Sequence, residues 1–509
     1  MRKSGILTAV FSLPNEYGIG CFSKEAYDFV DFLAESNQKF WQILPLGPTG
    51  YGDSPYQSFS TFAGNPYYID LQEFIDNGWL SKEECREAYD EYYESNDWYQ
   101  GATEDERNNY VDYEAQYYAR FSLLRRAYER SFIESDKDYA KFILEEAYWL
   151  DDYALYMAIK DENRGASMYD WDDALRLRKE KAIKKAKKDL APQIGFYKFL
   201  QYFFKKQWLS LKKYANEKSV EIIGDIPIYV ALDSADTWSN PDLFIFDEDL
   251  KPKGVAGCPP DYFSATGQLW GNPLYDWDVH KKDGFSWWIK RLKKCFELYD
   301  VVRIDHFRAF DEYYFIPFGD LTAEFGYWVP GPGYDLFKAV KKELNKPRII
   351  AEDLGFLTPT VLKLVKRTGY PGMKVLEFAF DSEEDNDYLP HNYDKNCVVY
   401  TGTHDNDTVK GWYKTLKRVD KAQLKVYLDI KNSKNISKDM IKLAESSVAE
   451  TCIIPIQDIF ALDSGARINT PSTLGNNWKW RLLPKYLEGE KRSETISYLS
   501  NITKTYGRM

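Results

Sequence analysis

The chain has 509 residues, of which 44% are hydrophobic, and a net charge of −12. This length allows one large enzyme domain with insertions or two to three ordinary domains. The acidic balance argues against nucleic acid or an anionic membrane as a partner, because phosphate binding needs clustered Lys and Arg, and it favours a neutral ligand.

Cysteine and histidine usage gives no sign of cross-links or metal. The six Cys are widely scattered without a CxxC pair, and the chain has only four His. We therefore expect no disulfide framework, no structural zinc, no cofactor and a cytoplasmic protein. The first residues, MRKSGILTAVFSLP, imitate a short secretory signal, but no small-x-small cleavage site follows them.

Eight short apolar or β-branched runs end at polar or Gly-rich residues and are predicted to be strands. They span 40–46, 65–71, 221–230, 299–305, 347–353, 373–381, 396–405 and 451–459. Amphipathic helical segments such as 287–299 and 358–369 separate most of them. Doubly apolar strands alternating with helices indicate a parallel sheet between helical layers, and eight units favour a closed (β/α)₈ TIM barrel over an open sheet. Periodicity alone indicates only a mostly parallel α/β fold.

Two connections are too long to be single helices. The segment 80–215 after the second strand is mostly charged, Tyr-rich helix and is predicted to be an insertion on the flank of the barrel. The segment 254–277 after the third strand is rich in Pro, Gly and aromatic residues and is predicted to be an irregular lid loop. The expected organisation is therefore 1–79 as the first part of the barrel, 80–215 as the insertion and 216–509 as the remainder.

Several predicted strands end on an acid. These acids are Asp225, Asp305, Glu352, Asp381 and Asp405. One acid after a strand is usually a helix cap or a solvated turn residue. In a parallel barrel, however, all strands end on one face, so five such carboxylates are expected to converge on one pocket. Asp353 is expected to point away from this pocket, and Asp407 to cap or brace a turn.

Converging acids suit two chemistries. One is binding of a divalent metal, and the other is cleavage of a glycosidic bond by two carboxylates. The sequence has neither a GxxxxGK[ST] phosphate loop nor a calcium loop, in which Asp-x-Asp continues as D-x-[DN]-x-[DN]-G. Its 15 Trp and 40 Tyr suit stacking on sugar faces, so the second chemistry is favoured and no metal is predicted.

Several stretches resemble a known family. They are DSPYQSFSTFAGNPYYIDL (53–71), GDIPIYVALDSADTW (224–238), AGCPPDYFSATGQLWGNPLY (256–275), RIDHFRAF (303–310), AEDLG (351–355), TGTHDNDT (401–408) and IPIQDIFAL (454–462). These resemble the 4-α-glucanotransferases called amylomaltase or disproportionating enzyme, in the α-amylase superfamily. Agreement runs from about residue 4 to residue 482, whereas 80–195 carries no matching motif. The resemblance also sharpens the count of eight barrel strands.

The resemblance implies that Asp305 is the nucleophile, Glu352 the general acid/base and Asp405 the stabiliser of the transition state. It implies that the cleaved glucose unit is held by Asp225, Arg303, His306, Asp381 and His404. Further implied contacts are Ser54 and Tyr56 near the first barrel strands, Tyr262, Phe263, Gln268 and Trp270 in a mobile loop over the acceptor side, and Asn469 in a late loop. One departure is SGILTAVFSLPNEYGIG, where relatives tend to read SGILLHxTSLPxxYGIG, which weakens any polar contact assigned there.

These roles require a different environment for each acid. Asp305 must be ionised, and Arg303 on the same strand face is expected to lower its pKa. Glu352 must carry a proton, so burial and the charge of Asp305 are expected to raise its pKa. A retaining enzyme needs the two carboxyl groups about 5 to 5.5 Å apart.

Three functions are consistent with these residues. The first is a transglycosylase with α-1,4-glucans as donor and acceptor and glucose as a further acceptor. The second is an amylase-type hydrolase of the same glucans, which would release new reducing ends. The third is a silent glucan-binding protein, which would be expected to lack one of the three catalytic acids; none is missing. The sequence predicts no oligomeric state.

Overall fold

The computed structural model describes residues 2–50, 52–94, 96, 103–260, 264–355, 357–380 and 386–509. Eight parallel strands form its main sheet, in the order β10-β11-β12-β1-β2-β3-β6-β9. They are β1 (Lys3–Leu7), β2 (Phe40–Gln42), β3 (Glu221–Pro227), β6 (Val301–Asp305), β9 (Ile349–Ala351), β10 (Gly372–Val375), β11 (Cys397–Tyr400) and β12 (Thr451–Pro455). The two edge strands meet where Ala351 N donates to Pro371 O at 2.9 Å, which confirms the predicted (β/α)₈ barrel.

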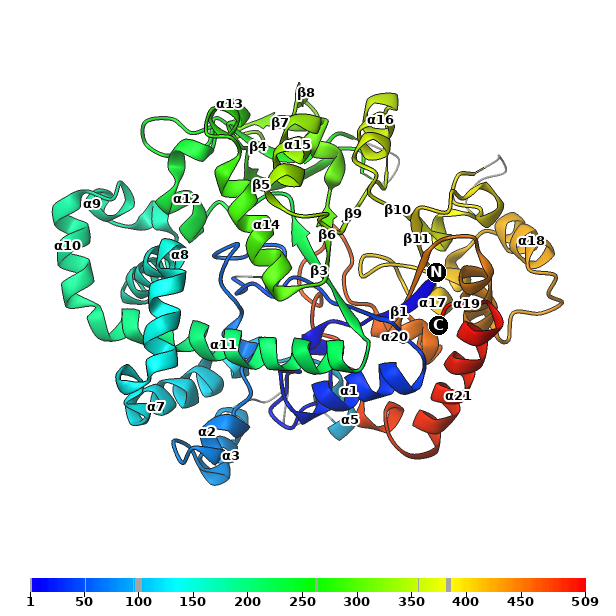
Figure 1. Cartoon of the computed structure of the whole chain (residues 1–509), viewed down its shortest axis with the longest axis horizontal. Helices are drawn as coiled ribbons and strands as arrows, with labels where there is room; N and C mark the ends of the chain where they lie inside the picture. Colours follow the sequence, from blue (N-terminus) through cyan, green and yellow to red (C-terminus); the bar gives the residue numbers. More distant parts are fainter. Residues whose placement is uncertain are drawn as a thin grey trace.

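Helices surround the sheet (Figure 1). The helices outside the insertion include α1 (Lys24–Glu35), α12 (Ala235–Ser239), α13 (Trp277–Lys282), α14 (Ser286–Leu298), α15 (Tyr334–Glu343), α16 (Pro359–Thr368), α17 (Val409–Thr415), α18 (Arg418–Tyr427), α19 (Ile436–Ser446), α20 (Ile456–Ile459) and α21 (Gly489–Thr505). α14 and α16 confirm the helices predicted at 287–299 and 358–369. Strands such as β11, with all four residues buried, are covered on both faces, which explains their uninterrupted apolar sequence.

The prediction of a strand at 65–71 is wrong. Pro66–Tyr68 form a short 3-10 helix, capped by the Asn65 side chain, which accepts a hydrogen bond from Tyr67 N. Pro66 has no N–H to donate to a sheet, so this apolar run cannot continue a ladder. The missing barrel strand is β1, at the very segment that imitates a secretory signal, and it pairs with both β12 and β2.

A helical insertion connects β2 to β3, and its helices α7 to α10 lie on the left of Figure 1. Its helices include α2 (Gln72–Asp76), α3 (Lys82–Glu94), α5 (Glu104–Asn109), α6 (Tyr113–Ala115), α7 (Phe121–Ser131), α8 (Lys137–Glu162), α9 (Asp173–Arg176), α10 (Glu180–Asp189) and α11 (Ala191–Glu217). The buried Glu146 of α8 accepts hydrogen bonds from Lys205 of α11 at 2.5 Å and from Lys294 of α14 at 2.7 Å. This ionic cluster ties the insertion to the barrel.

The segment 254–277 is not an irregular loop. It contains β4 (Gly254–Cys258) and β5 (Gln268–Pro273), which join β7 (Glu312–Pro317) and β8 (Tyr327–Pro330) in an antiparallel sheet of order β5-β4-β7-β8. Val255, Tyr314 and Ile316 form a small core on one face of this sheet. β4 and β5 are short and contain Gly, so the alternation of apolar residues is not recognisable in their sequence.

The two ends of the chain lie side by side (Figure 1). The Arg508 guanidinium donates to Lys3 O at 3.3 Å, and Arg2 donates to Ser447 O at 2.6 Å. All six Cys are free thiols, in agreement with their scatter along the sequence. Among the described helices, none combines the length and the apolar character that crossing a bilayer requires.

Candidate active site

Acidic side chains gather at the carboxyl end of the barrel. Asp305 is the last residue of β6, Glu352 directly follows β9, and Asp225 lies near the end of β3. Asp405 lies further out, five residues beyond the end of β11. Because parallel strands of a barrel end on one face, this is the face where the acids can act together.

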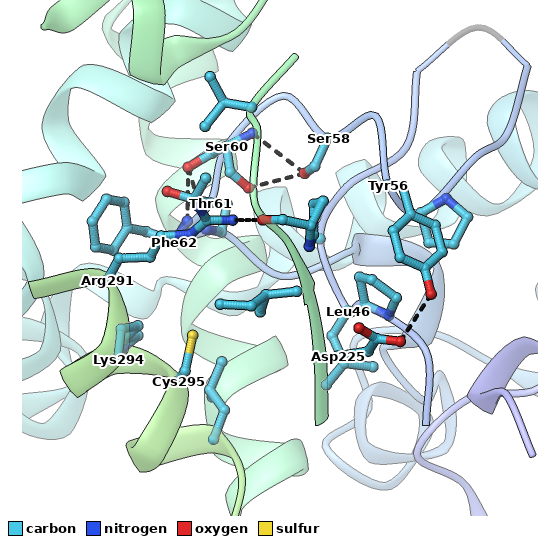
Figure 2. Close-up of a pocket in the computed structure, with 18 of the residues that line it drawn as sticks. Leu46, Tyr56, Ser58, Ser60, Thr61, Phe62, Asp225, Arg291, Lys294 and Cys295 are labelled. Atoms are coloured by element: carbon cyan, nitrogen blue, oxygen red, sulfur yellow. Dashed lines mark hydrogen bonds between the residues drawn. The ribbon is translucent and has the colours of Figure 1, made fainter. Parts of the chain in front are cut away.

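Arg303 organises one side of the site. Its Nη1 donates to both carboxylate oxygens of Asp225 at 2.7 and 2.6 Å, and its Nη2 donates to Asp305 Oδ1 at 3.0 Å. Residues 303 and 305 face the same way because side chains alternate along a strand. Asp225 also accepts from the Tyr56 hydroxyl at 2.9 Å (Figure 2), so a fixed chain of charged and polar groups orients the Asp305 carboxylate.

The expected pKa shift of Asp305 is wrong in sign. Burial raises the pKa of this carboxyl above its ordinary value, and Arg303 only partly offsets the effect. The negative charges of Asp225 and Asp405 also raise the pKa. Neither the burial of Asp305 nor the sharing of the Arg303 guanidinium with Asp225 can be recognised in the local sequence.

Glu352 is held by main-chain donors. His306 N donates to its Oε2 at 2.6 Å and Leu354 N to its Oε1 at 3.1 Å. His306 has a left-handed backbone with a φ of 52°, a conformation uncommon outside glycine and often found at functional sites. Burial and the neighbouring charge of Asp305 raise the pKa of Glu352 to about 8, so this carboxyl keeps its proton at neutral pH.

The pKa of Asp405 is shifted in the opposite direction from that of Glu352. Burial works against its ionisation, but His404 and the Asn469 amide together lower the pKa of Asp405 to about 2. His404 Nε2 lies 3.3 Å from Asp405 Oδ2, and Asn469 Nδ2 donates to Oδ1 at 2.6 Å. Arg467 Nη2 donates to the main-chain oxygen of Asp405 at 2.5 Å. The site therefore holds one protonated acid and one firmly ionised acid.

Aromatic rings flank these acids. The Tyr56 ring stacks on the His404 ring at a centroid distance of 5.1 Å, and Trp478 packs against both. On the other side, the Trp270 ring meets the His306 ring edge-on at 4.8 Å, and Trp270 Nε1 donates to Gln268 Oε1 at 3.0 Å. Flat rings next to carboxylates suit a sugar, which has apolar faces and hydroxyl edges.

Ser54 has a supporting place. Its hydroxyl accepts from Tyr56 N at 3.3 Å, so it braces the turn that carries Tyr56. Behind this turn, a cavity of about 50 Å³ lies between Tyr56, Asp225 and the side chains of Arg291 and Cys295 (Figure 2). None of Asp305, Glu352 or Asp405 lines this cavity, so it backs the site and is separate from the catalytic centre.

Twelve of the fifteen predicted site residues lie in the described part of the chain. Linked contacts join Ser54, Tyr56, Asp225, Arg303, Asp305, His404, Asp405 and Asn469. His306, which follows Asp305 in the chain, contacts both Glu352 and Trp270, and Trp270 bonds to Gln268. Tyr262, Phe263 and Asp381 lie outside the described residues. Sequence reasoning missed Arg467 and Trp478, whose only signal was their position near Asn469 in a late polar loop.

Asp353 and Asp407 are where the sequence suggested. Asp353 accepts a hydrogen bond from Met373 N at 2.7 Å and faces the neighbouring strand. Asp407 accepts from the Ser464 hydroxyl at 2.7 Å and from Thr408 N, so it braces a turn.

Known proteins resemble this chain over its whole length. A family model described as 4-alpha-glucanotransferase matches residues 8–486. The 4-alpha-glucanotransferase of Clostridium butyricum is 46% identical over 98% of this chain and 99% of its own. That of Streptococcus pneumoniae serotype 4 is 50% identical over 94% of this chain and 93% of its own.

A solved structure gives the same result. The amylomaltase from Streptococcus agalactiae, in complex with acarbose, is 40% identical, covers 100% of both chains and superimposes with a TM-score of 0.93. Identity of 40% to 50% over nearly the full length agrees with the match to the family model. The chain belongs to the 4-alpha-glucanotransferase family.

Proposed function

We propose that this enzyme transfers a segment of an α-1,4-glucan to the 4-hydroxyl of another glucan or of glucose, by double displacement with retention. The observation that supports this most is the placement of Asp305 and Glu352 at the carboxyl ends of the paired strands β6 and β9, where burial and the charge of Asp305 raise the pKa of Glu352 to about 8. One acid that keeps its proton next to one that attacks is what a retaining mechanism needs.

In the first step Asp305 attacks the anomeric carbon. A carboxylate oxygen of Asp305 forms a bond to the anomeric carbon while the bond from that carbon to the leaving 4-oxygen breaks. The proton of Glu352 moves to the leaving 4-oxygen. The products are a covalent glycosyl-enzyme, a shortened glucan with a restored hydroxyl and an ionised Glu352. The hydrogen bond from Arg303 to Asp305 orients the attacking carboxylate.

In the second step an acceptor 4-hydroxyl replaces the departed sugar. Glu352, now a base, takes the hydroxyl proton while the acceptor oxygen displaces Asp305 from the anomeric carbon. The total number of glycosidic bonds is unchanged. Asp405 and His404 stabilise both transition states, because an ionised carboxylate with a pKa of about 2 favours the positive charge that develops on the sugar ring.

The residues around Trp270 favour transfer over hydrolysis. A hydrolase would use the same acids and differ only in accepting water in the second step. Trp270 is half-buried beside His306, whose main-chain N–H holds Glu352, so a sugar stacked there would displace water from the base. The acarbose bound to the Streptococcus agalactiae amylomaltase is consistent with a carbohydrate site on this fold.

Incubation with maltotriose tests the proposal. We expect glucose and longer oligomers to appear while the total of reducing ends stays constant. Rising reducing ends would instead identify the amylase-type hydrolase, and unchanged maltotriose would identify a binding protein. A glucose-supplemented reaction, in which labelled glucose enters longer oligomers, tests glucose as an acceptor.

A further inference from the structure

The barrel has one irregular seam, between β9 and β10. These strands are the two edges of the sheet order, and between described residues the bond from Ala351 N to Pro371 O is the main-chain bond that joins them. In a regular parallel pair, the next bond would run from Met373 N to the main-chain oxygen of Ala351. Met373 N donates instead to Asp353 Oδ1 at 2.7 Å. A side-chain carboxylate therefore takes the place of a main-chain carbonyl.

Gly372 makes this substitution possible. A Cβ atom on this residue would lie 2.2 Å from Asp353 Oδ2 and 2.7 Å from its Cγ, closer than real atoms approach. The missing side chain opens the space that the carboxylate fills, which is a use of glycine independent of its backbone freedom. The Asp353 carboxylate and Gly372 are therefore matched across the seam.

The matched pair adjoins Glu352. The main chain of Glu352 is fixed to the β6 side, where Glu352 N donates to Ile304 O at 3.1 Å and Phe307 N donates to Glu352 O at 3.1 Å. The next residue, Asp353, fixes the chain to the β10 side. Adjacent residues of an extended chain face opposite ways, so tying Asp353 to the seam directs Glu352 into the site.

We propose that Asp353 is a positioning residue: by completing the seam against Gly372 it sets the orientation in which the Glu352 carboxyl meets the leaving oxygen. The inference depends on the proposed role of Glu352 as the acid. It predicts a loss confined to acid-assisted chemistry, because a small displacement of a catalytic group affects the step that uses that group most strongly.

Two glycosyl donors distinguish loss of acid catalysis from a general loss of activity, because only one of them needs a proton on its leaving group. Maltotriose needs a proton on its leaving oxygen, whereas α-maltosyl fluoride releases fluoride without one. The ratio kcat/KM for each donor reports on formation of the glycosyl-enzyme, the first step alone. We expect Asp353→Ala to lose about 100-fold with maltotriose and less than about 5-fold with the fluoride.

Two further variants sharpen the test. Asp353→Asn keeps an oxygen that can accept from Met373 N, so it should stay within about 3-fold of the parent on both donors. Gly372→Ala displaces the carboxylate without removing it and should reproduce the pattern of Asp353→Ala. It also carries the comparison if Asp353→Ala does not fold.

Asp300→Ala is the matched control. Asp300 Oδ2 accepts from Ile222 N at 2.8 Å, which is the same kind of side-chain bond to a neighbouring strand, at the amino end of the barrel. Its removal should affect both donors equally. Equal losses on both donors in Asp353→Ala, as in Asp300→Ala, would overturn the proposal and leave Asp353 a purely structural residue.

Glu352→Ala tests the role of Glu352 as the acid separately from the positioning role of Asp353. It should lose far more with maltotriose than with the fluoride. If Glu352→Ala shows this difference and Asp353→Ala does not, only the positioning role fails. If Glu352→Ala loses equally on both donors, Glu352 is not the acid, and the proposed mechanism and the role of Asp353 are both wrong.

Discussion

Two carboxyl groups of this site, Glu352 and Asp405, are held in opposite states by different means. Glu352 lies one residue beyond a strand and receives hydrogen bonds from main-chain N–H groups, with burial and the charge of Asp305 raising its pKa. Asp405 lies in a loop five residues beyond β11 and is bound by side chains, with His404 and Asn469 lowering its pKa against the effect of burial. Neither side chain is fully buried, and that of Asp405 is 43% exposed, but desolvation acts to raise both pKa values, so desolvation alone does not decide the state.

The comparison shows that the nearest charges decide which acid keeps its proton. A carboxylate neighbour favours the neutral form of Glu352, and an imidazole and an amide favour the ionised form of Asp405. It also shows that a strand end positions a residue through the backbone, whereas a loop residue needs braces supplied by other side chains. Substitutions that remove a charge or a brace therefore test the comparison directly.

The largest effect is expected from removal of the Asp305 carboxylate, whose charge raises the pKa of Glu352. Asp305→Asn removes the proposed nucleophile and should lower kcat by about 10⁴-fold or more, while glucan binding measured by calorimetry is preserved. In the same variant the pKa of Glu352 should fall, because the carboxylate charge is gone. A titration that leaves the Glu352 pKa unchanged would contradict the comparison.

The pH profile tests the proton on Glu352. Because this acid must be protonated and its pKa is raised to about 8, kcat/KM for maltotriose should fall as pH rises through about 8. Asp305 must be ionised and its pKa is also raised, so the acid limb should lie above the ordinary pKa of an aspartate. With α-maltosyl fluoride the alkaline limb should disappear, and its persistence there would assign that limb to another group.

Removal of one hydrogen bond to Asp405 should lower kcat/KM less than removal of Asp305 lowers kcat. Asn469→Ala deletes the bond to Asp405 Oδ1, and a hydrogen bond to a charged group is worth about 1.5–3 kcal/mol, or roughly 10- to 100-fold in kcat/KM. Asn477→Ala, which removes bonds to Thr470 and Thr473 in the same loop, is the matched control. Equal losses in both variants would mean that only the order of the loop matters.

The smallest effect is expected outside the acids. Trp270→Ala should shift products from transfer toward hydrolysis by roughly 5-fold, because loss of an aromatic contact worth about 1 kcal/mol weakens acceptor binding relative to water. The ratio of glucose to new reducing ends measures this shift. Leu269→Ala, at an exposed neighbour on β5, should leave the ratio unchanged. If the Trp270 variant keeps the parental ratio, the aromatic strand has no part in choosing the acceptor.

The sequence was informative where local pattern and chemistry coincide. The strand VVRID ends on Asp305 and the run RIIAED ends on Glu352 and Asp353, and the structure places all of them at the carboxyl end of the barrel. It was misleading where a short apolar run is compatible with either a strand or a 3-10 helix. NPYYIDL has the composition of a strand, but Pro66 and the Asn65 cap make it a 3-10 helix, while β1 was hidden in a segment that imitates a signal.

The amino-acid sequence by itself determined the parallel α/β class, because this depends on periodicity, and its motifs indicated the barrel and the family through their resemblance to known proteins. It also placed Asp305 and Glu352 at strand ends, because an acid after an apolar run is a local pattern. Only the tertiary structure decided the direction in which the pKa of Asp305 shifts and the hydrogen bond from Arg467 to the main chain of Asp405. It also decided the packing of Trp478 and the contact between Asp353 and Gly372. Those features join residues far apart in the chain, and their energies depend on distances and burial that no local pattern encodes.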